Sequence, residues 1–157
     1  MDSLFTVSSV VTGENASADI SGLIGQYAHG NEPSHHMAYL YNYLGKPSQT
    51  QKFVNKIMYE LYTDQADGLC GNEDCGQMSA WYVMSAMGFY PVNPCGGEYE
   101  LGIPLFPKVK LHLANGKRFT ITSDRDNGMH NVLLNGKPID DTTISHKDIM
   151  QGGKLSF

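Results

Sequence analysis

The sequence is poor in charged residues, and it lacks the features of several common protein classes. Only 17% of its 157 residues are charged, against roughly 25% in an average soluble domain, and the formal net charge is −5. This balance provides no basic surface, so we do not expect nucleic acid as a partner. No apolar run approaches the ~18 residues of a membrane span, so no membrane partner is expected either. The chain has the length of one domain, which is long enough to bury a hydrophobic core.

The first twenty residues lack the features of a targeting segment. They have neither the positively charged start nor the apolar core of a secretory signal peptide. Their small and polar side chains predict a poorly packed lead-in to the domain.

Cysteine is scarce as well. Cys70, Cys75 and Cys95 cannot all pair within one chain, because there are only three of them. Cys70 and Cys75 are further apart in the sequence than the two-residue spacing of most zinc knuckles. Buried free thiols are the favoured interpretation, and a single disulfide with one remaining thiol is the alternative.

Helical patterns occupy the first half of the chain. Residues 34–44 have apolar side chains at helical spacing, with Ser34 as the expected N-cap and Gly45 at the expected C-terminal end. Residues 50–61 repeat the pattern, and the short connection predicts an antiparallel helical hairpin. A third helix is expected over residues 77–87.

The third predicted helix is apolar almost all round and contains Trp81. Such a helix is normally buried on every side. Because the chain has too few other helices to surround it, we expect self-association or packing against further helices of a larger protein.

Strand patterns replace helical ones from residue 97 onward. Two Asn-Gly pairs, Asn115-Gly116 and Asn135-Gly136, lie between apolar runs and predict tight hairpins. The sequence therefore predicts an α+β fold, with a helical array in residues 1–95 and antiparallel β-strands in residues 96–157.

Two polar loops precede predicted helices, over residues 29–36 and 71–77. If consecutive helices alternate in direction, the starts of the first and third helices lie on the same side of the array. We therefore expect the two loops to face one pocket.

The loops allow several kinds of chemistry. Their Asn, Asp and Glu oxygens suit a hard cation such as Ca²⁺. Zinc binding by His29, His35 and His36 is less favoured, because the spacing of known zinc motifs is missing. Paired carboxylates could act as general acid and base. The structural alternative is that Ser34 and Asp74 only cap helices and that the glutamates favour the positive helix ends.

Two segments of the sequence resemble a known family. "GLIGQYAHGNEPSHHMAYLYNYLG" and "DGLCGNEDCGQMSAWYVMSAMGFYPVNP" are similar to the signatures of glycoside hydrolase family 92, the calcium-dependent inverting exo-α-mannosidases. The resemblance extends to the closing "GGKLSF". Proteins of this family are several times longer, with a β-sandwich followed by an (α/α)6 barrel. The resemblance implies that residues 1–95 form the last helices of the barrel with its active-site loops, and that residues 96–157 form the C-terminal strands.

The resemblance also implies roles for individual residues. Asp74 would be the general base, with Asn72 beside it where many members have aspartate. Asn31 and Glu32 would bind Ca²⁺. The substrate-binding residues would be His29, Gly30, His35 and Glu73.

Mannose-containing glycans would be the substrates, and a secreted or periplasmic location is implied. The general acid lies earlier in the chains of this family, so we expect little or no activity from these residues alone. The partner would be the preceding part of the enzyme or a second copy of the chain. The alternatives are a sugar- or calcium-binding module, a structural remnant, or a complete small metal-dependent hydrolase.

Overall fold

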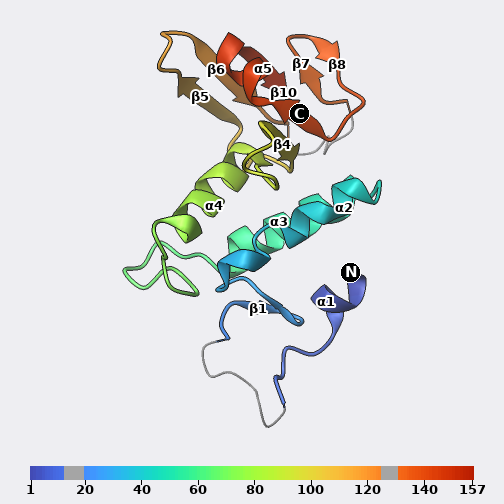
Figure 1. Cartoon of the computed structure of the whole chain (residues 1–157), viewed down its shortest axis with the longest axis vertical. Coiled ribbons are helices and arrows are strands. Elements are labelled where there is room, and N and C mark those ends of the chain that lie inside the picture. Colours follow the sequence, from blue (N-terminus) through green and yellow to red (C-terminus); the bar gives the residue numbers. More distant parts are fainter. Residues whose placement is uncertain (13–19, 125–130) are drawn as a thin grey trace.

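The computed structural model describes residues 1–12, 20–124 and 131–157, with helices in one part and two sheets in the other (Figure 1). The helical part contains α1 (Asp2–Thr6), β1 (Leu23–Ile24), β2 (Tyr27–Ala28), the 3-10 turns η1 (Glu32–Ser34) and η2 (Met37–Tyr39), α2 (Leu40–Tyr43), α3 (Pro47–Glu60) and α4 (Gln77–Met87). The strand part contains β3 (Phe89–Tyr90), β4 (Glu98–Leu101), β5 (Lys108–His112), β6 (Arg118–Thr122), β7 (Leu133–Leu134), β8 (Lys137–Pro138), β9 (Thr143–Ser145), α5 (His146–Gln151) and β10 (Gly153–Ser156). The predicted α+β class is confirmed, whereas the (α/α)6 barrel stays a prediction.

The helical hairpin forms, but its first arm is irregular. α2 and α3 lie side by side and run in opposite directions, and the chain reverses at Gly45, which has a φ of 65° (Figure 1). The prediction of one helix over residues 34–44 is wrong, because η1 and η2 precede the short α2. Ser34 belongs to η1 and is not an N-cap. Apolar spacing of three residues is compatible with 3-10 turns as well as with an α-helix, so the pattern could not separate them.

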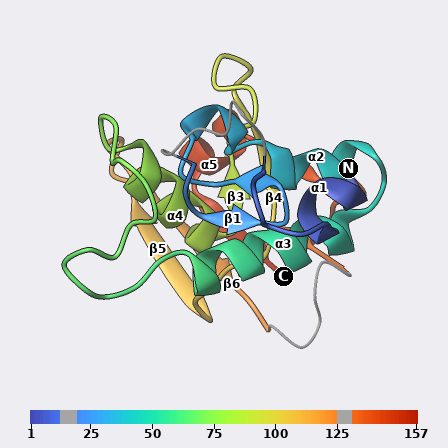
Figure 2. The same cartoon turned by 90° about the horizontal axis from the view of Figure 1, so that it is seen from below.

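The first residues pack more closely than predicted. The ring of Phe5 in α1 stacks on Phe53 of α3, with the ring centroids 4.3 Å apart, and α1 lies near α3 in Figure 2. The hydroxyl of Tyr41 donates a hydrogen bond of 2.8 Å to Asp2. The expectation of a poorly packed lead-in is therefore wrong for α1, because one aromatic side chain anchors it to the core.

Helix α4 ends as predicted but is not buried on every side. Gly88, with a φ of 100°, terminates it. Met78, Trp81 and Ser85 share one face and are fully buried, whereas Val83 on another face is 54% exposed. One face of α4 is therefore open in this chain, which agrees with the expectation that the chain has too few helices to surround it.

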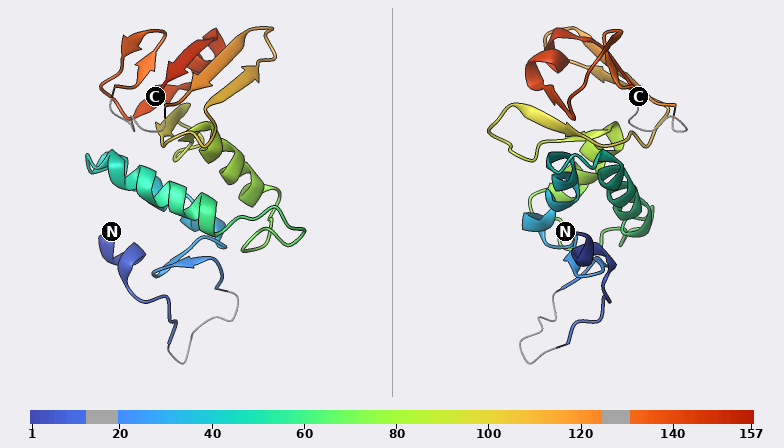
Figure 3. Two further views of the ribbon diagram at one scale, coloured as in Figure 1. Left: turned by 180° about the vertical axis from the view of Figure 1, so that it is seen from behind. Right: turned by 90° about the vertical axis from the view of Figure 1, so that its right-hand side faces the viewer.

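The strands form two main sheets. β3, β4 and β9 form a three-stranded antiparallel sheet, and a five-stranded sheet has the order β5-β6-β10-β7-β8 (Figure 3). The predicted hairpins at Asn115-Gly116 and Asn135-Gly136 join β5 to β6 and β7 to β8. The prediction of a wholly antiparallel arrangement is wrong for one pair, because β10 runs parallel to β6. The long connection between these two strands allows a parallel pairing that no local turn signal reveals.

Helix α5 was not expected from the sequence, although a capping signal was present. The hydroxyl of Ser145 accepts a hydrogen bond from the backbone N–H of Asp148, whose carboxylate accepts one from the backbone N–H of Ser145. This Ser-x-x-Asp capping box is an acidic variant of a known helix start. Ile149 of α5 is buried in the core of the five-stranded sheet.

The two parts of the fold have separate hydrophobic clusters that meet at α4. Trp81 and Ala86 belong to the cluster of the helical part. Met84 and Met87 pack against the cluster of the strand part. The proposed boundary between residues 95 and 96 stays a prediction, but α4 provides the physical link that holds the sheets against the helices.

Candidate functional site

The two polar loops converge on one cavity, as the alternating helix directions predict. The cavity has a volume of about 430 Å³. Its lining residues come from both loops, from the segment before β1 and from β2: Ile20, Ser21, Ala28, Gly30, Asn31, Glu32, Asn72 and Asp74.

Glycines allow the two loops to touch through their backbones. A Cβ atom added to Gly71 would lie 2.6 Å from the Cα atom of Gly30. A Cβ atom added to Gly30 would in turn meet the Ser21 side chain and lie 3.1 Å from the carbonyl oxygen of Cys70. Neither position has room for a side chain, so these glycines set the distance between the loops.

Substituting Gly71→Ala is expected to push the loops apart and to lower the free energy of unfolding by about 1–3 kcal/mol, as overpacking does. Thermal unfolding followed by circular dichroism measures the effect. Gly102→Ala is the matched control, because its added Cβ would make only ordinary contacts of 3.4 Å or more with Tyr39. Equal stability of the two variants would contradict a close contact between the loops.

An unusual turn directs Asp74 toward the cavity. Asp74, Cys75 and Gly76 all have a positive φ, of 40°, 59° and 85°. The Glu73 carboxylate accepts hydrogen bonds from the backbone N–H and the hydroxyl of Ser79, at 3.1 and 2.9 Å. Glu73, and not Asp74, therefore satisfies the N-terminus of α4, so the predicted capping role of Asp74 is wrong.

The carboxyl groups of Glu32 and Asp74 meet across the two loops. The two carboxyls can share a hydrogen bond only when one of them is protonated, and this favoured protonated form, with the negative charge of Glu32, raises the pKa of Asp74 above its usual value. One oxygen of Glu32, Oε1, is buried and has no hydrogen-bond partner. With Asn31 and Asn72 at the same cavity, the oxygen atoms present are of the kind that binds a hard cation. Among the described residues, no three His, Cys, Asp or Glu side chains gather into a metal site, so amide, backbone or water oxygens would have to complete one.

His29 does not line the cavity, although its neighbours Ala28 and Gly30 do. It is fully buried, and its Nδ1 and Nε2 atoms lie 2.7 and 2.6 Å from the hydroxyls of Tyr27 and Tyr62. The Tyr62 hydroxyl donates to the carbonyl oxygen of Met78, so it accepts from Nε2–H of His29 while Nδ1 accepts from Tyr27. Burial and the neighbouring His35 lower the pKa of His29 to about 3, and the ring is neutral. With both nitrogens engaged, His29 is not available as a zinc ligand.

His35 is held in a similar way. Its Nε2 atom donates to the carbonyl oxygen of His29 at 3.0 Å, and Nδ1 accepts from the Gln77 amide at 3.1 Å. The indole N–H of Trp81 donates to the carbonyl oxygen of His35. Burial lowers the pKa of His35, so this ring is also neutral. His35 lines a different cavity, of about 310 Å³, together with His36 and Gln77.

The structure thus divides the expected site residues into two groups. Gly30, Asn31, Glu32, Asn72 and Asp74 line the common cavity. His29, His35 and Glu73 do not line this cavity, and their side chains are hydrogen-bonded to other residues of the helical part. Sequence reasoning assigned no role to Tyr27, Tyr62 or Gln77, whose side chains hold the two histidines.

The three cysteines are unpaired, as the favoured interpretation predicts, but only Cys70 is partly buried. Cys70 is half-buried, and burial raises the pKa of its thiol. Cys75 and Cys95 are exposed, which contradicts the expectation of buried thiols. A thiol with a raised pKa is a poor nucleophile, so nothing favours cysteine chemistry at Cys70.

Comparisons with known proteins agree on one family. The family model described as "Glycosyl hydrolase family 92 catalytic domain" matches residues 1–157. The solved structure of the family GH92 alpha-mannosidase BT3965 from Bacteroides thetaiotaomicron is 43% identical in sequence, with a TM-score of 0.87. The match covers 99% of this chain and 21% of the BT3965 chain. The inverting mannosidase BT2199 from the same organism is 48% identical, with a TM-score of 0.74. The match covers 84% of this chain and 18% of the BT2199 chain.

A curated protein is also similar. An "Uncharacterized secreted glycosidase" of Arthroderma benhamiae is 33% identical over 135 residues, which is 82% of this chain and 17% of that protein. The chain thus spans about a fifth of the length of the relatives that it matches. Within the part of the chain that the structure describes, no helix has both the length and the apolar character needed to cross a bilayer.

Proposed function

The chain belongs to glycosyl hydrolase family 92, and from this premise we propose that it forms one wall of the active site of an α-mannosidase. The observation that carries the proposal is the meeting of Glu32 and Asp74 in the cavity between the two loops. Support comes from the solved mannosidases, one of which is described in complex with mannoimidazole. Mannose-containing glycans are the proposed substrates. A secreted or periplasmic location is proposed because a relative is described as secreted.

Asp74 is the proposed general base. Its carboxylate is exposed at the cavity, and its raised pKa makes it a stronger base than an ordinary aspartate. Asn72 lies in the same cavity and can hold a water molecule or a sugar hydroxyl, but its amide cannot accept a proton as a base. Gly30 lines the cavity as well. His29, His35 and Glu73 are proposed to position the loops.

The general acid is proposed to come from outside these residues. In an inverting glycosidase, acid and base carboxyls lie about 6.5–9.5 Å apart to leave room for water and sugar. The carboxyl of Glu32 lies directly beside that of Asp74, which is too close for this role, and the carboxylate of Glu73 accepts hydrogen bonds from Ser79. The described residues offer the cavity no other Asp or Glu.

This proposal predicts that the purified chain, supplied with Ca²⁺, shows little or no hydrolysis of an aryl α-mannoside. Its release of the aryl group should equal that of the Asp74→Asn variant. Turnover that depends on Asp74 would show that the unit is complete and would contradict the proposal of a missing acid. Calorimetric titration with mannoimidazole tests the site itself. Binding that Asp74→Asn weakens supports the proposed wall, whereas no binding favours a structural remnant.

Calcium is the proposed cation of the cavity. Asn31 and Glu32 would hold it, and the unpartnered Oε1 atom of Glu32 supports this assignment. Bound Ca²⁺ would hold the hydroxyls of the sugar at this wall.

Substituting Glu32→Gln is expected to weaken Ca²⁺ binding at least tenfold, because one negative charge and one buried oxygen ligand are lost. Isothermal titration calorimetry of the purified chain with CaCl₂ measures this. Glu98→Gln is the matched control, since Glu98 is exposed on β4 and does not line the cavity. Equal affinities for the two variants would remove Glu32 from the cation site.

A further inference from the structure

The five-stranded sheet has one face that carries several positive charges. Phe119, Ile121 and Leu155 point to the other face and are buried in the core that α5 covers. Side chains alternate between the two faces of a strand, so the residues between these three point outward. On β5, β6 and β10 the outward positions hold Lys108, Lys110, His112, Arg118, Thr120, Thr122, Lys154 and Ser156. We call this surface the outer face.

The pairing of the strands gathers the charges of the outer face. Lys110 of β5 lies opposite Thr120 of β6, and Thr120 lies opposite Lys154 of β10, so one threonine separates two lysines. Arg118 lies opposite His112. The side chains of Lys110, Arg118 and Lys154 are exposed. Positive charges gathered in this way repel one another, and a bound anion would remove this repulsion.

The three strands provide no carboxylate that could neutralise the outer face. Residues 108–112, 118–122 and 153–156 contain no Asp or Glu. Within the part of the chain that the structure describes, Lys108, Lys110, Arg118 and Lys154 form no ion pair. The expectation of no basic surface, which comes from the net charge of −5, is therefore wrong for this face, because the charges are unevenly distributed along the chain.

The hydroxyls of the outer face are suited to an oxygen-rich anion. Thr120, Thr122 and Ser156 lie between the cations. The hydroxyl of Thr122 donates to that of Ser156 at 3.1 Å, which leaves the O–H of Ser156 to donate to a ligand. Sulfate and carboxylate groups accept such hydrogen bonds as well as those of lysine and arginine.

Other polyanions fit the outer face less well. Its positions on β5, β6 and β10 include no Phe, Tyr or Trp on which unpaired bases could stack. They include no apolar side chain that could enter a lipid surface. A polysaccharide is favoured, and this choice rests on the proposed function, because a hydrolase of glycans meets its substrate in glycan material.

We propose that the outer face binds an anionic polysaccharide, through its sulfate or carboxylate groups, and so holds the protein in a glycan matrix. The five-stranded sheet lies at the opposite end of the structure from β1 and β2, beside which the cavity of Asp74 opens (Figure 1). A matrix bound at the outer face therefore leaves that cavity free for a mannose glycan. Lysine side chains are rarely buried, so this face is not one that other parts of a larger protein would cover.

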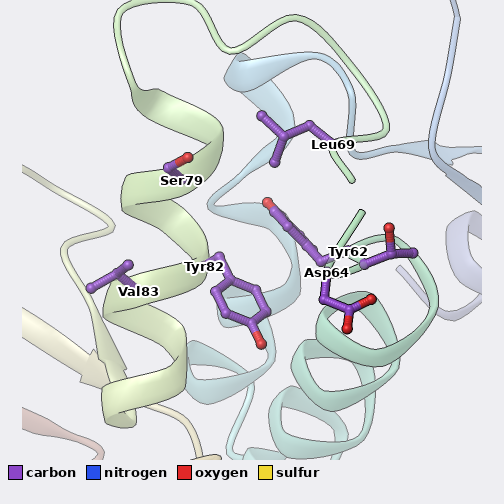
Figure 4. A pocket seen from close by; sticks show the side chains of 7 residues that line it. Tyr62, Asp64, Leu69, Ser79, Tyr82 and Val83 are labelled. Atoms are coloured by element: carbon purple, nitrogen blue, oxygen red, sulfur yellow. The ribbon is translucent and has the colours of Figure 1, made fainter. Parts of the chain in front are cut away.

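A further cavity, beside α4, does not suit the same ligand. It has a volume of about 440 Å³, and Figure 4 shows the carboxylate of Asp64 among the side chains that line it. Asp64 is the one charged residue of this lining, and its negative charge would repel an anion. Positive charge, rather than the size of a cavity, therefore places the polysaccharide on the outer face.

Binding of the purified chain to immobilised dextran sulfate, measured by surface plasmon resonance in 0.15 M NaCl with EDTA, tests the proposal. Lys110→Gln with Lys154→Gln is expected to lower the affinity at least tenfold, and added salt should weaken binding by the wild type. Lys46→Gln with Lys147→Gln is the matched control, because both lysines are exposed outside the outer face and the net charge changes equally. Lys110→Arg with Lys154→Arg keeps the charge and should keep the affinity.

Each result decides for or against the proposal. Loss of affinity in the glutamine variant of the outer face, but not in its arginine variant or in the control, supports it. Binding of polygalacturonate with the same order of variants would add carboxylate groups to sulfate. No binding by the wild type, equal loss in both glutamine variants, or equally strong binding of uncharged dextran overturns it. Tighter binding of a DNA duplex or of phosphatidylserine vesicles overturns it as well, because the partner is then of another class.

The same measurement separates this proposal from the proposed active site. Asp74→Asn and Glu32→Gln alter the cavity between the two loops and should bind dextran sulfate as the wild type does. Failure of calcium or mannoimidazole binding would therefore leave the outer face supported, and failure of dextran sulfate binding would leave the active site supported.

Discussion

Substituting Trp81→Ala should lower the free energy of unfolding by about 3–5 kcal/mol, the range for removing a buried aromatic side chain. The indole is fully buried and lies edge-on to His29, with the ring centroids 4.4 Å apart. It also stacks on Tyr62 and donates its N–H to the carbonyl oxygen of His35. A protein of this size is stable by only about 5–15 kcal/mol, so much of the fold would be lost.

Urea unfolding, followed by far-ultraviolet circular dichroism, measures this loss. Trp81→Phe keeps most of the apolar volume but leaves the His35 carbonyl without its donor, so a smaller loss of about 1–3 kcal/mol is expected. Val83→Ala on the open face of the same helix should change stability by less than about 0.5 kcal/mol. A Trp81→Ala chain as stable as the Val83→Ala chain would show that the cluster around Trp81 does not hold α4 in place.

Acidification should destabilise the chain well before most carboxylates are protonated. The pKa of His29 is about 3 in the folded chain because burial and His35 oppose its protonation, against about 6.5 for an ordinary histidine. The unfolded chain therefore takes up a proton as the pH falls below about 6.5, and the folded chain does not. The stability that depends on neutral His29 is complete above this pH and is lost as the pH falls toward 3. The loss is about 1.4 kcal/mol for each pH unit and each proton.

Urea midpoints measured between pH 7.5 and 4 test this dependence. His29→Gln keeps polar contacts for Tyr27 and Tyr62 but has no proton to bind, so its stability should decline less steeply with falling pH. His35 has a lowered pKa as well and adds to the slope in the same direction. Asp74, with its raised pKa, acts in the opposite direction, but its carboxyl is exposed and its contribution is small. If the urea midpoints of the wild type and of His29→Gln fall equally steeply with pH, His29 is not a neutral buried histidine.

The sequence was sufficient for helix α3, for the end of α4, for the two Asn-Gly hairpins and for the approach of the two loops. Hairpins at Asn-Gly pairs and a helix ending at Gly88 follow from local chemistry, which acts within a few residues. Convergence of the loops follows from helix direction alone, and it required no knowledge of side-chain contacts. Residue identity and spacing therefore indicated Asn31, Glu32, Asn72 and Asp74 as neighbours.

The remaining features depend on contacts between distant residues. His29 is neutral and buried because Tyr62, 33 residues later, accepts its ring N–H. The parallel pairing of β10 with β6 depends on the whole intervening connection. Glu73 and Asp74 are adjacent acidic residues, and only the three-residue left-handed turn decides which caps α4 and which faces the cavity. The periodicity of apolar and polar residues does not contain this information.

The central position of β10 has a consequence for biosynthesis. Among the described residues, β10 follows every other strand, yet it lies in the middle of the sheet and joins the β5–β6 hairpin to the β7–β8 hairpin. Ribosomes release a protein from its amino end, so both hairpins leave the exit tunnel before the strand that unites them. Until then β6 and β7 each present an unpaired edge, which can capture a strand of another chain. Chaperones that shield such edges would therefore raise the yield of folded protein most in the interval before β10 emerges.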